Sequence, residues 1–207
     1  MKLVLASQNQ KKLVELQEIL NDLGVTVLSQ NELGVQVEVE ETGKTFAENA
    51  LLKAEAVMQR TGLPAIADDS GLMVDALGGA PGVYSARYGG PDLDDAGRYQ
   101  LLLEAMKGKN PRSCRFVSAI ACCFPNGDVL QAEGSCEGQL AEAPRGEGGF
   151  GYDPIFYVPE LQKTMAELTA EEKNQISHRG RALRSFAAYY KVYLKSKQGN
   201  LSAQEEQ

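Results

Sequence analysis

The sequence predicts one mixed α/β domain with two lobes. Short apolar segments typical of buried strands alternate with segments whose apolar residues repeat at helical spacing. The chain has 207 residues, close to the usual length of a single domain. Glycine-rich stretches separate these segments, but no linker or internal repeat divides the chain.

The N-terminal part predicts the order strand, polar loop, helix, strand. Residues 2–6 are apolar and run into polar residues, as a buried strand does. Apolar side chains then recur at helical spacing from Leu13 to Leu23, and Gly24 is expected to end that helix. Residues 25–28 predict the second strand.

A second helix and a third strand follow. Thr45 and Glu48 have the spacing of a capping box, and the helix that they open is expected to run to about Arg60. Residues 64–67 predict a short buried strand. We expect this strand to end where the acidic pair Asp68-Asp69 begins.

The C-terminal half predicts a hairpin between helices. Asn126-Gly127 lies between two apolar runs, which favours a type I′ turn. The domain is expected to span residues 1–196, and the polar residues 197–207 to form a disordered tail. The expected elements are a helix over 94–106, strands over 113–124 and 128–137, a short helix opened by a Thr169–Glu172 capping box, and a final helix from about Ser177.

Charge and composition exclude several classes of protein. The chain has 28 acidic and 21 basic residues, a net charge of −7, so we expect no nucleic-acid partner, because duplex binding needs a basic face. No apolar run approaches the roughly 20 residues of a membrane helix, so no membrane partner is expected either. The four cysteines have no C-x-x-C spacing and His178 is the only histidine, which argues against a zinc site. Reduced cysteines fit a cytoplasmic protein.

A polar loop, Ser7–Lys12, joins the first strand to the first helix. Backbone N–H groups and the positive end of the helix dipole at such a place favour a phosphate group, and two lysines add positive charge. Taken alone, this pattern favours a solvated helix start over a phosphate site.

Two acidic pairs, Glu40-Glu41 and Asp68-Asp69, predict a metal site. Mg²⁺ prefers oxygen ligands, and in proteins it takes one or two carboxylates together with substrate phosphates. The alternative for Asp68-Asp69 is a plain acidic turn. Lys53 lies four residues after Asn49, and this spacing alone predicts a solvated lysine on a polar helix face.

Two further segments could contact a base. Residues 145–154 place four glycines around Phe150, whose ring either stacks on a base or packs in the core. Lys173 and the Ser177-His178-Arg179 segment lie where two helices are expected to meet, and their side chains can donate hydrogen bonds to carbonyl or phosphate oxygens. A lone histidine is more often structural than catalytic.

Taken in chain order, these segments resemble the inosine/xanthosine triphosphate pyrophosphatase family over residues 1–195. The first loop departs from the family, which often has Thr-Gly-Asn or Thr-His-Asn where this chain has Ser7-Gln8-Asn9; the hydroxyl and the Asn are kept. The segments that carry the resemblance are 7–12, 40–46, 49–54, 67–72, 77–88, 149–156 and 170–179.

The resemblance implies a homodimeric, Mg²⁺-dependent hydrolase that converts dITP, ITP and XTP to the monophosphate and pyrophosphate. It implies an elongated α/β fold, with a mixed twisted sheet, flanking helices and two lobes around a central cleft. Asp69 would be the general base and a metal ligand, and Glu40 or Glu41 the second metal carboxylate. The substrate would be bound by Ser7, Gln8, Asn9, Gln10, Lys11, Lys12, Lys53, Ser70, Phe150, Gly151, Tyr152, Asp153, Lys173, His178 and Arg179.

The residues themselves are compatible with this chemistry. Water attacking the α-phosphorus needs a base near the metal, which Asp69 would supply. Donors on His178 and Arg179 would pair with the 6-keto oxygen of the purine and would be left unpaired by the amino group of adenine. Two alternatives stay open: a metal-dependent phosphatase that releases the γ-phosphate, and a nucleotide sensor without catalysis.

Overall fold

The fold is described for residues 1–205 by a computed structural model. The side chains of Lys11 and of residues 198–205 lie outside the described part, and so does the expected role of Lys11 in substrate binding. Within residues 1–205, every helix is too short or too polar to cross a membrane.

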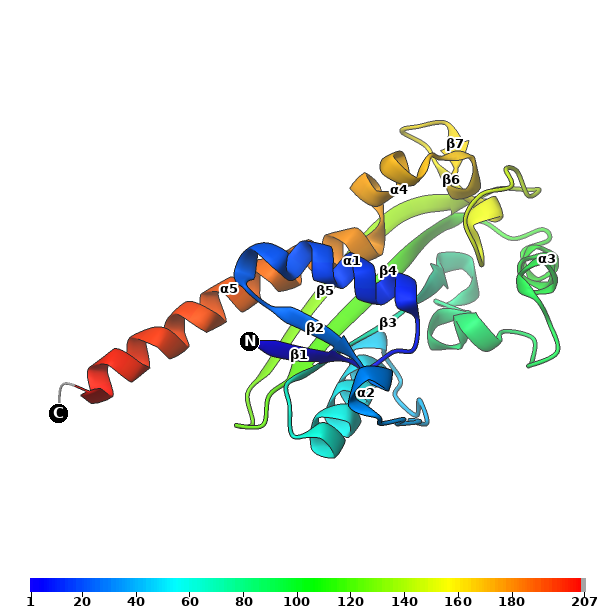
Figure 1. The fold of residues 1–207 in the computed structure, drawn as a ribbon. Helices are drawn as coiled ribbons and strands as arrows, with labels where there is room; N and C mark the ends of the chain where they lie inside the picture. The colour runs from blue at the N-terminus through cyan, green and yellow to red at the C-terminus, as the bar shows by residue number, and fades with distance from the viewer. Residues whose placement is uncertain (206–207) are drawn as a thin grey trace.

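A seven-stranded mixed sheet forms the centre of the molecule, in the order β2-β1-β3-β4-β5-β6-β7. The first three strands of this order are parallel, and each later neighbour pairs antiparallel. The long strands β3, β4 and β5 lie next to one another in the middle of this order (Figure 1). The bounds are β1 Lys2–Leu5, β2 Thr26–Ser29, β3 Ala65–Val74, β4 Ser113–Cys123, β5 Val129–Leu140, β6 Phe156–Val158 and β7 Lys163–Thr164.

Helices flank both faces of this sheet. On one face α2 packs against β3 and β4, and on the other α5 packs against β4 and β5 and contacts α1. Figure 1 shows α5 continuing well past the sheet, which gives the molecule its elongated shape. The bounds are α1 Gln10–Leu20, α2 Phe46–Thr61, α3 Asp95–Ala105, α4 Ala170–Ile176 and α5 His178–Glu205.

Two large hydrophobic cores define the two lobes. The first includes Leu3 from β1, at the parallel end of the sheet, together with Leu20 and Phe186 from the helices at positions 10–20 and 178–205. The second includes Leu102 from α3 and Phe156 from β6. The long strands contribute to both cores, so they join the lobes rigidly. The expected α/β fold with two lobes is confirmed.

Most of the expected elements are present. The capping boxes at Thr45 and Thr169 are both formed, and the Thr45 box opens α2 as expected. The hairpin at Asn126-Gly127 is present, but the type I′ turn was a wrong prediction. Gly127 has a positive φ of 87° and Asn126 does not, whereas a type I′ turn needs two positive values. The Gly127 N–H donates to the Phe124 carbonyl, so Pro125 lies inside the turn, where its fixed φ favours type I.

The third strand differs most from the prediction. It was expected to end before Asp68, but β3 continues through the acidic pair to Val74. Its partner β4 explains the difference, because β4 pairs with β3 residue by residue from Ala65 to Val74. The last helix also extends beyond expectation, since α5 continues to Glu205, through most of the expected tail. The domain boundary at residue 196 stays a prediction.

Candidate active site

The site lies where β1 stops and β3 continues. Strand β1 pairs with β3 only as far as Ile66. Along a strand, the backbone N–H and C=O groups of successive residues point to alternate edges. The Ile66 C=O and the Leu72 N–H both form hydrogen bonds on the edge that faces β1. The N–H and C=O groups of Asp68 and Ser70 therefore face the same open edge. Among the described residues, no strand covers this edge between positions 67 and 72.

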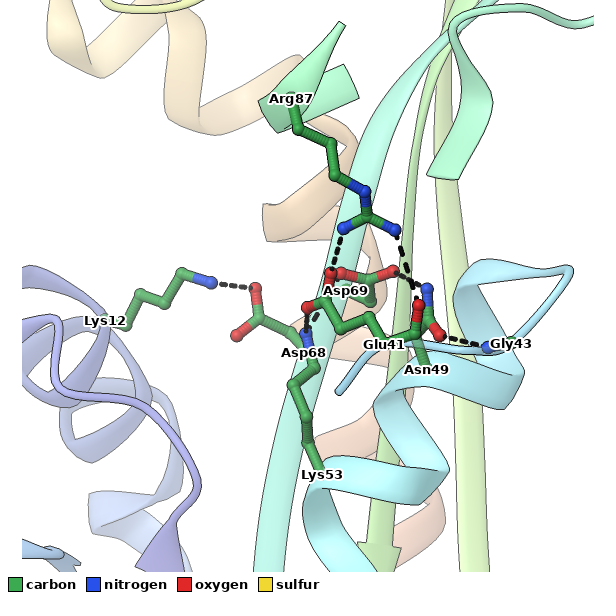
Figure 2. Close-up of polar contacts among 8 residues, drawn as sticks. All are labelled: Lys12, Glu41, Gly43, Asn49, Lys53, Asp68, Asp69 and Arg87. Atoms are coloured by element: carbon green, nitrogen blue, oxygen red, sulfur yellow. Dashed lines mark hydrogen bonds and ion pairs between the residues drawn. The ribbon is translucent and has the colours of Figure 1, made fainter. Parts of the chain in front are cut away.

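The Asp69 side chain faces α2 and is held there by two residues of that helix. Lys53 Nζ donates to Asp69 Oδ1 at 3.0 Å, and Asn49 Nδ2 donates to Asp69 Oδ2 at 3.2 Å (Figure 2). Asn49 is fully buried, and its own oxygen accepts from the Gly43 N–H at 2.8 Å. A Cβ on Gly43 would lie only 2.6 Å from that oxygen, so only glycine allows this approach. The turn before α2 thus fixes the orientation of Asn49.

Lys53 joins Asp69 to Glu41. Its ammonium also donates to Glu41 Oε1 at 2.9 Å, and its side chain is 18% exposed. The solvated lysine expected from the spacing alone is therefore wrong, because two carboxylates draw Lys53 inward. Glu40 is exposed and Glu41 is partly buried. Of the two glutamates, it is Glu41 that lies beside Asp69 in this arrangement.

Arg87 binds the second carboxylate oxygen of Glu41. Its Nη1 donates to Glu41 Oε2 at 3.0 Å, and its Nη2 donates to the Glu41 carbonyl at 3.4 Å (Figure 2). Arg87 is the last residue of a 3₁₀ helix, Gly82–Arg87. This helix belongs to the segment that follows β3, so the segment and the acidic loop before α2 meet at this ion pair.

Asp68 faces the opposite side of the sheet from Asp69. Its carboxylate is buried and accepts from Lys12 Nζ of α1 at 2.8 Å. Burial alone would raise the pKa of Asp68, but the charges of Lys12 and Arg179 hold that pKa below its usual value. Asp68 is therefore ionised at neutral pH and bound to a lysine of the predicted phosphate loop.

Ionisation differs among the carboxylates on the α2 side. Burial raises the pKa of Asp69 above its usual value, against the opposing charge of Lys53. Burial acts the same way on Glu41, but Lys53 and Arg87 outweigh it and lower the pKa of Glu41. Burial would lower the pKa of Lys53, yet the charge of Asp69 raises it, so the lysine stays protonated. Of these two carboxylates, Asp69 is the one whose pKa the site raises, which suits a base.

The predicted phosphate loop lies at the carboxyl ends of the parallel strands β1 and β2. Residues 7–10 line a hollow there together with Ser29–Asn31 of the neighbouring strand end. Inside the loop, the Asn9 N–H donates to Ser7 Oγ at 3.2 Å, and the Lys12 N–H donates to Asn9 Oδ1 at 3.4 Å. Asn9 thus caps α1, and the loop exposes Gln8 and Gln10.

The glycine-rich loop presents one aromatic ring at the surface. Phe150 is 76% exposed, and Lys173 Nζ lies 4.8 Å from its ring centroid. The buried Asp153 carboxylate accepts from the Phe150 N–H at 2.9 Å and from Lys173. Tyr152 is also buried, and its hydroxyl donates to the Ser85 carbonyl at 2.8 Å. Of these side chains Phe150 is free to stack, while Tyr152 and Asp153 hold the loop. The Gly151 N–H donates to Asp95 of α3 at 2.7 Å.

His178 begins α5 beside the sheet. Its ring stacks on Phe116 of β4 at 4.9 Å between centroids, and its Nδ1 is buried without a hydrogen-bond partner in the described structure. Burial lowers the pKa of His178 to about 4, and the charges of Lys173 and Arg179 contribute. The ring is therefore neutral at pH 7. A Cβ on Gly134 of β5 would lie 2.3 Å from the His178 carbonyl, so this glycine lets α5 begin against the sheet.

Arg179 lies on the inner side of α5. Its Nε is 3.2 Å from Glu15 Oε2 of α1, and the side chain is 20% exposed. Arg179 and Asp68 both line a small cavity between α1, α5 and the sheet. The charges of Asp68, Lys12, Lys173 and Arg179 all act on His178, so these four side chains lie within electrostatic range of the His178 ring.

Carboxylate oxygens are the donors that this site offers to a metal ion. Among the side chains that the structure describes, no cluster of three or more His, Cys, Asp or Glu residues could hold a metal. Glu41 and Asp69 nevertheless share Lys53, which places two carboxylates around one cation. Two carboxylates with substrate phosphates are a set that Mg²⁺ accepts, so the residues fit this ion.

Besides Asn49, sequence reasoning missed two residues of the site. Arg87 lies within the motif at 77–88, but no role was predicted for it. Glu15 appeared only as part of the first helix. Both act by holding another functional side chain, and neither position carries a local pattern that reveals a partner distant in sequence. A glycine-rich, aromatic segment before Arg87 was the one available signal.

Comparison with known proteins gives concordant results. Residues 3–189 match the model of the Ham1 family. A dITP/XTP pyrophosphatase from Desulforamulus reducens is 54% identical over 186 residues, which are 89% of this chain and 92% of the relative. The dITP/XTP pyrophosphatase of Bacillus subtilis is 50% identical over 186 residues, 89% of this chain and 94% of the relative.

Solved structures agree. A HAM1 protein from Coxiella burnetii superposes with a TM-score of 0.88 at 49% identity, over 92% of this chain and 98% of the other. The Ham1 protein of Staphylococcus aureus gives a TM-score of 0.86 at 42% identity, over 95% of this chain and 100% of the other. The resemblance seen in the motifs is confirmed, and this chain belongs to the Ham1 family.

Proposed function

We propose that this chain hydrolyses the non-canonical purine nucleotides dITP, ITP and XTP to the monophosphate and pyrophosphate. The observation that carries the proposal is the pair of carboxylates, Glu41 and Asp69, bound to one buried lysine beside an open strand edge. The names of the relatives support the substrate class. A metal-dependent phosphatase and a nucleotide sensor are the alternatives that the test must exclude.

Mg²⁺ is the proposed cofactor, with Asp69 and Glu41 as its protein ligands. When bound, the ion would neutralise phosphate charge and stabilise the leaving pyrophosphate. A triphosphate brings about four negative charges to a chain of net charge −7, so cations must gather locally. Lys12 and Lys53 supply such cations. They bind Asp68 and Asp69 at the open edge of β3, from opposite faces of the sheet.

Asp69 is proposed to accept the proton of the attacking water. The water oxygen forms a bond to the α-phosphorus, the bond from that phosphorus to the α–β bridging oxygen breaks, and pyrophosphate leaves with the electron pair. The raised pKa of Asp69 favours proton uptake. Asn49 and Lys53 fix the direction in which its oxygens point. No covalent enzyme intermediate is needed.

The purine is proposed to lie between Phe150 and the start of α5. The exposed Phe150 ring offers a stacking surface. His178 is neutral, so one ring nitrogen donates and the other accepts, and Arg179 donates only. These donors suit a 6-keto oxygen. Ser70 and the loop 7–10 complete the proposed contacts to the nucleotide, with Lys173 beside Phe150.

The proposal includes a homodimer in the cytoplasm. All four cysteines are free thiols and buried, which fits a reducing compartment. Sedimentation velocity of the purified protein tests the oligomeric state directly: a single species at twice the chain mass supports the dimer, and a monomer at micromolar concentration contradicts it.

The function is tested by a turnover assay that resolves the products. ITP, XTP, dITP, ATP and GTP are each incubated with the enzyme, with and without Mg²⁺, and the products are separated by ion-exchange chromatography. Pyrophosphate and monophosphate from the first three, dependent on Mg²⁺, support the proposal. Orthophosphate and diphosphate would identify a γ-phosphatase, and binding without products would identify a sensor.

A further inference from the structure

All four oxygens of the proposed metal-binding carboxylates already accept a hydrogen bond. On Glu41, Oε1 accepts from Lys53 and Oε2 accepts from Arg87, at 2.9 and 3.0 Å. On Asp69, Oδ1 accepts from Lys53 and Oδ2 accepts from Asn49, at 3.0 and 3.2 Å. Because each carboxylate oxygen has two lone pairs, a divalent cation that binds these oxygens must either share them with the present donors or take the place of one donor.

The three donors differ in how easily they can leave. Asn49 is fully buried and is fixed by the Gly43 N–H, and the Lys53 side chain is only 18% exposed. The Arg87 side chain is 42% exposed and lies at the end of a 3₁₀ helix. Its guanidinium carbon lies 5.1 Å from the ring centroid of Tyr84, which is itself exposed. Arg87 is the donor with the smallest burial and a clear path to solvent.

Charge balance points to the same residue. Glu41 and Asp69 carry two negative charges, and Lys53 and Arg87 carry two positive charges, so this group of four is neutral. A divalent cation added without any rearrangement would give the group an excess of two positive charges. Moving the guanidinium away relieves this repulsion, and an arriving triphosphate supplies the negative charge that the guanidinium then needs.

We propose that Arg87 is an exchange cation of the active site. It neutralises Glu41 while the metal is absent, leaves Glu41 when the metal binds, and then pairs with the phosphate groups that leave as pyrophosphate. This assignment rests on the proposed function, because it needs a metal-bound triphosphate as the second partner of the guanidinium. It predicts opposite effects of one substitution on metal binding and on turnover.

The metal arm uses Mn²⁺ alone as the probe, with the free ion measured by electron paramagnetic resonance in the absence of nucleotide. Arg87→Met keeps an unbranched apolar stem and removes the competing guanidinium charge. We expect it to bind Mn²⁺ about threefold to tenfold more tightly than the unaltered protein, the range expected for losing a half-exposed charged hydrogen bond. Arg87→Lys keeps the charge but not the planar fork of donors, so it should strengthen Mn²⁺ binding less than Arg87→Met does.

The phosphate arm uses ITP turnover and inhibition by pyrophosphate, both with Mg²⁺. Arg87→Met should lower kcat/KM for ITP by about tenfold or more and raise the inhibition constant of pyrophosphate by a similar factor. The matched control is Arg115→Met: Arg115 is 37% exposed and its Nη2 lies 2.8 Å from Asp75, but it lies away from the site. This control should change neither Mn²⁺ binding nor turnover.

The outcomes separate the two proposals. Unchanged or weaker Mn²⁺ binding by a folded Arg87→Met protein, judged by an unaltered melting temperature, would overturn the exchange role. So would an unchanged inhibition constant for pyrophosphate. If Arg87→Met fails to fold, the charge-keeping and charge-free variants Arg87→Lys and Arg87→Gln give the same comparison. If the unaltered protein makes no pyrophosphate from any triphosphate, the proposed function itself fails, and the exchange role fails with it even where the Mn²⁺ result is as expected.

Discussion

Asp68 and Asp69 are consecutive residues of β3, yet their carboxylates pair with lysines on opposite faces of the sheet. Asp68 binds Lys12 of α1, and Asp69 binds Lys53 of α2. In most of a sheet such neighbours would be separated by the layer of strands. Here β1 has already ended, so both lysines reach the same open edge. One acidic dipeptide thereby positions cations on two sides of the proposed substrate site.

Replacing Asp69 should remove turnover while nucleotide binding survives. Asp69→Asn keeps the shape of the side chain but cannot accept a proton from water, so we expect kcat for ITP to fall by at least about a hundredfold. The matched variant is Asp68→Asn, which loosens Lys12 and should raise KM more than it lowers kcat. The assignment fails if Asp69→Asn retains more than about a tenth of the original kcat at neutral pH.

The two lysines should discriminate between ligands by charge. Lys12→Ala and Lys53→Ala should each weaken binding of ITP more than binding of IMP, because charge-assisted hydrogen bonds strengthen with the charge of the ligand. Calorimetry with a non-hydrolysable triphosphate analogue measures both affinities. Equal losses for the two ligands would show that the lysine supports the fold alone. The exposed Lys107 pairs only within its own turn and provides the control, Lys107→Ala.

Arg179 should govern the choice of base. Arg179→Ala removes a buried donor proposed for the 6-keto oxygen, so kcat/KM should fall far more for ITP than for ATP. We expect the ratio between the two substrates to shrink at least about tenfold, or roughly 1.4 kcal/mol. Arg181→Ala is the control, because Arg181 is two residues further along α5 and donates to the Ser135 carbonyl of β5. If kcat/KM falls equally for ITP and for ATP, Arg179 binds phosphate or supports the fold.

His178 should make the folded state sensitive to mild acid. Its pKa is about 4 in the folded protein, against roughly 6.5 in an unfolded chain, so between these values the unfolded state binds more protons. The free energy of unfolding should therefore fall as the pH falls from about 6.5 towards 4, by about 2 kcal/mol between pH 7 and 5. Urea unfolding at both pH values measures this. In His178→Gln the free energy of unfolding should fall less over the same pH change, by that amount. Identical losses in the two proteins would contradict the prediction.

Gly134 should be intolerant of any side chain. Gly134→Ala places a methyl group against backbone atoms of His178 and Ala182, which cannot yield as a flexible side chain does. We expect a loss of about 1–3 kcal/mol in the free energy of unfolding, with a rise in KM for ITP as the start of α5 shifts. Glu133→Ala, at the exposed neighbouring position, is the control. A protein as stable as the original would show that α5 can move away from the sheet without loss.

Much of the fold could be predicted because its signals are local. The Thr45 capping box, the hairpin at Asn126-Gly127 and the apolar stripe of the last helix each lie within a few residues. The length of β3 was missed for the opposite reason. The Asp68-Asp69 pair is a poor strand former, and only pairing with β4, some fifty residues further along the chain, keeps it extended.

The sequence predicted most residues of the site but not the contacts between them. Motifs identified Lys53 and Asp69, yet the spacing of Lys53 alone indicated a solvated side chain. Its burial depends on Glu41 and Asp69 arriving from two other segments. The same holds for Arg87, whose partner Glu41 lies 46 residues earlier. Ion pairs between distant segments leave no local pattern for sequence reasoning to find.

The uncovered stretch of β3 also bears on how copies of this protein behave towards one another. Unpaired backbone groups along a strand form a template for another chain, and natural sheets resist such aggregation by placing charged residues along exposed edges. The acidic side chains at 68 and 69 stand beside that stretch. Substitutions that neutralise these two carboxylates should therefore be tested for their effect on solubility as well as on turnover. Loss of both negative charges would leave Lys12 and Lys53 without these partners, so the charge beside the edge would change from balanced to positive. Light scattering at high protein concentration would show whether this altered edge, the proposed entrance for the substrate, still resists pairing with another copy.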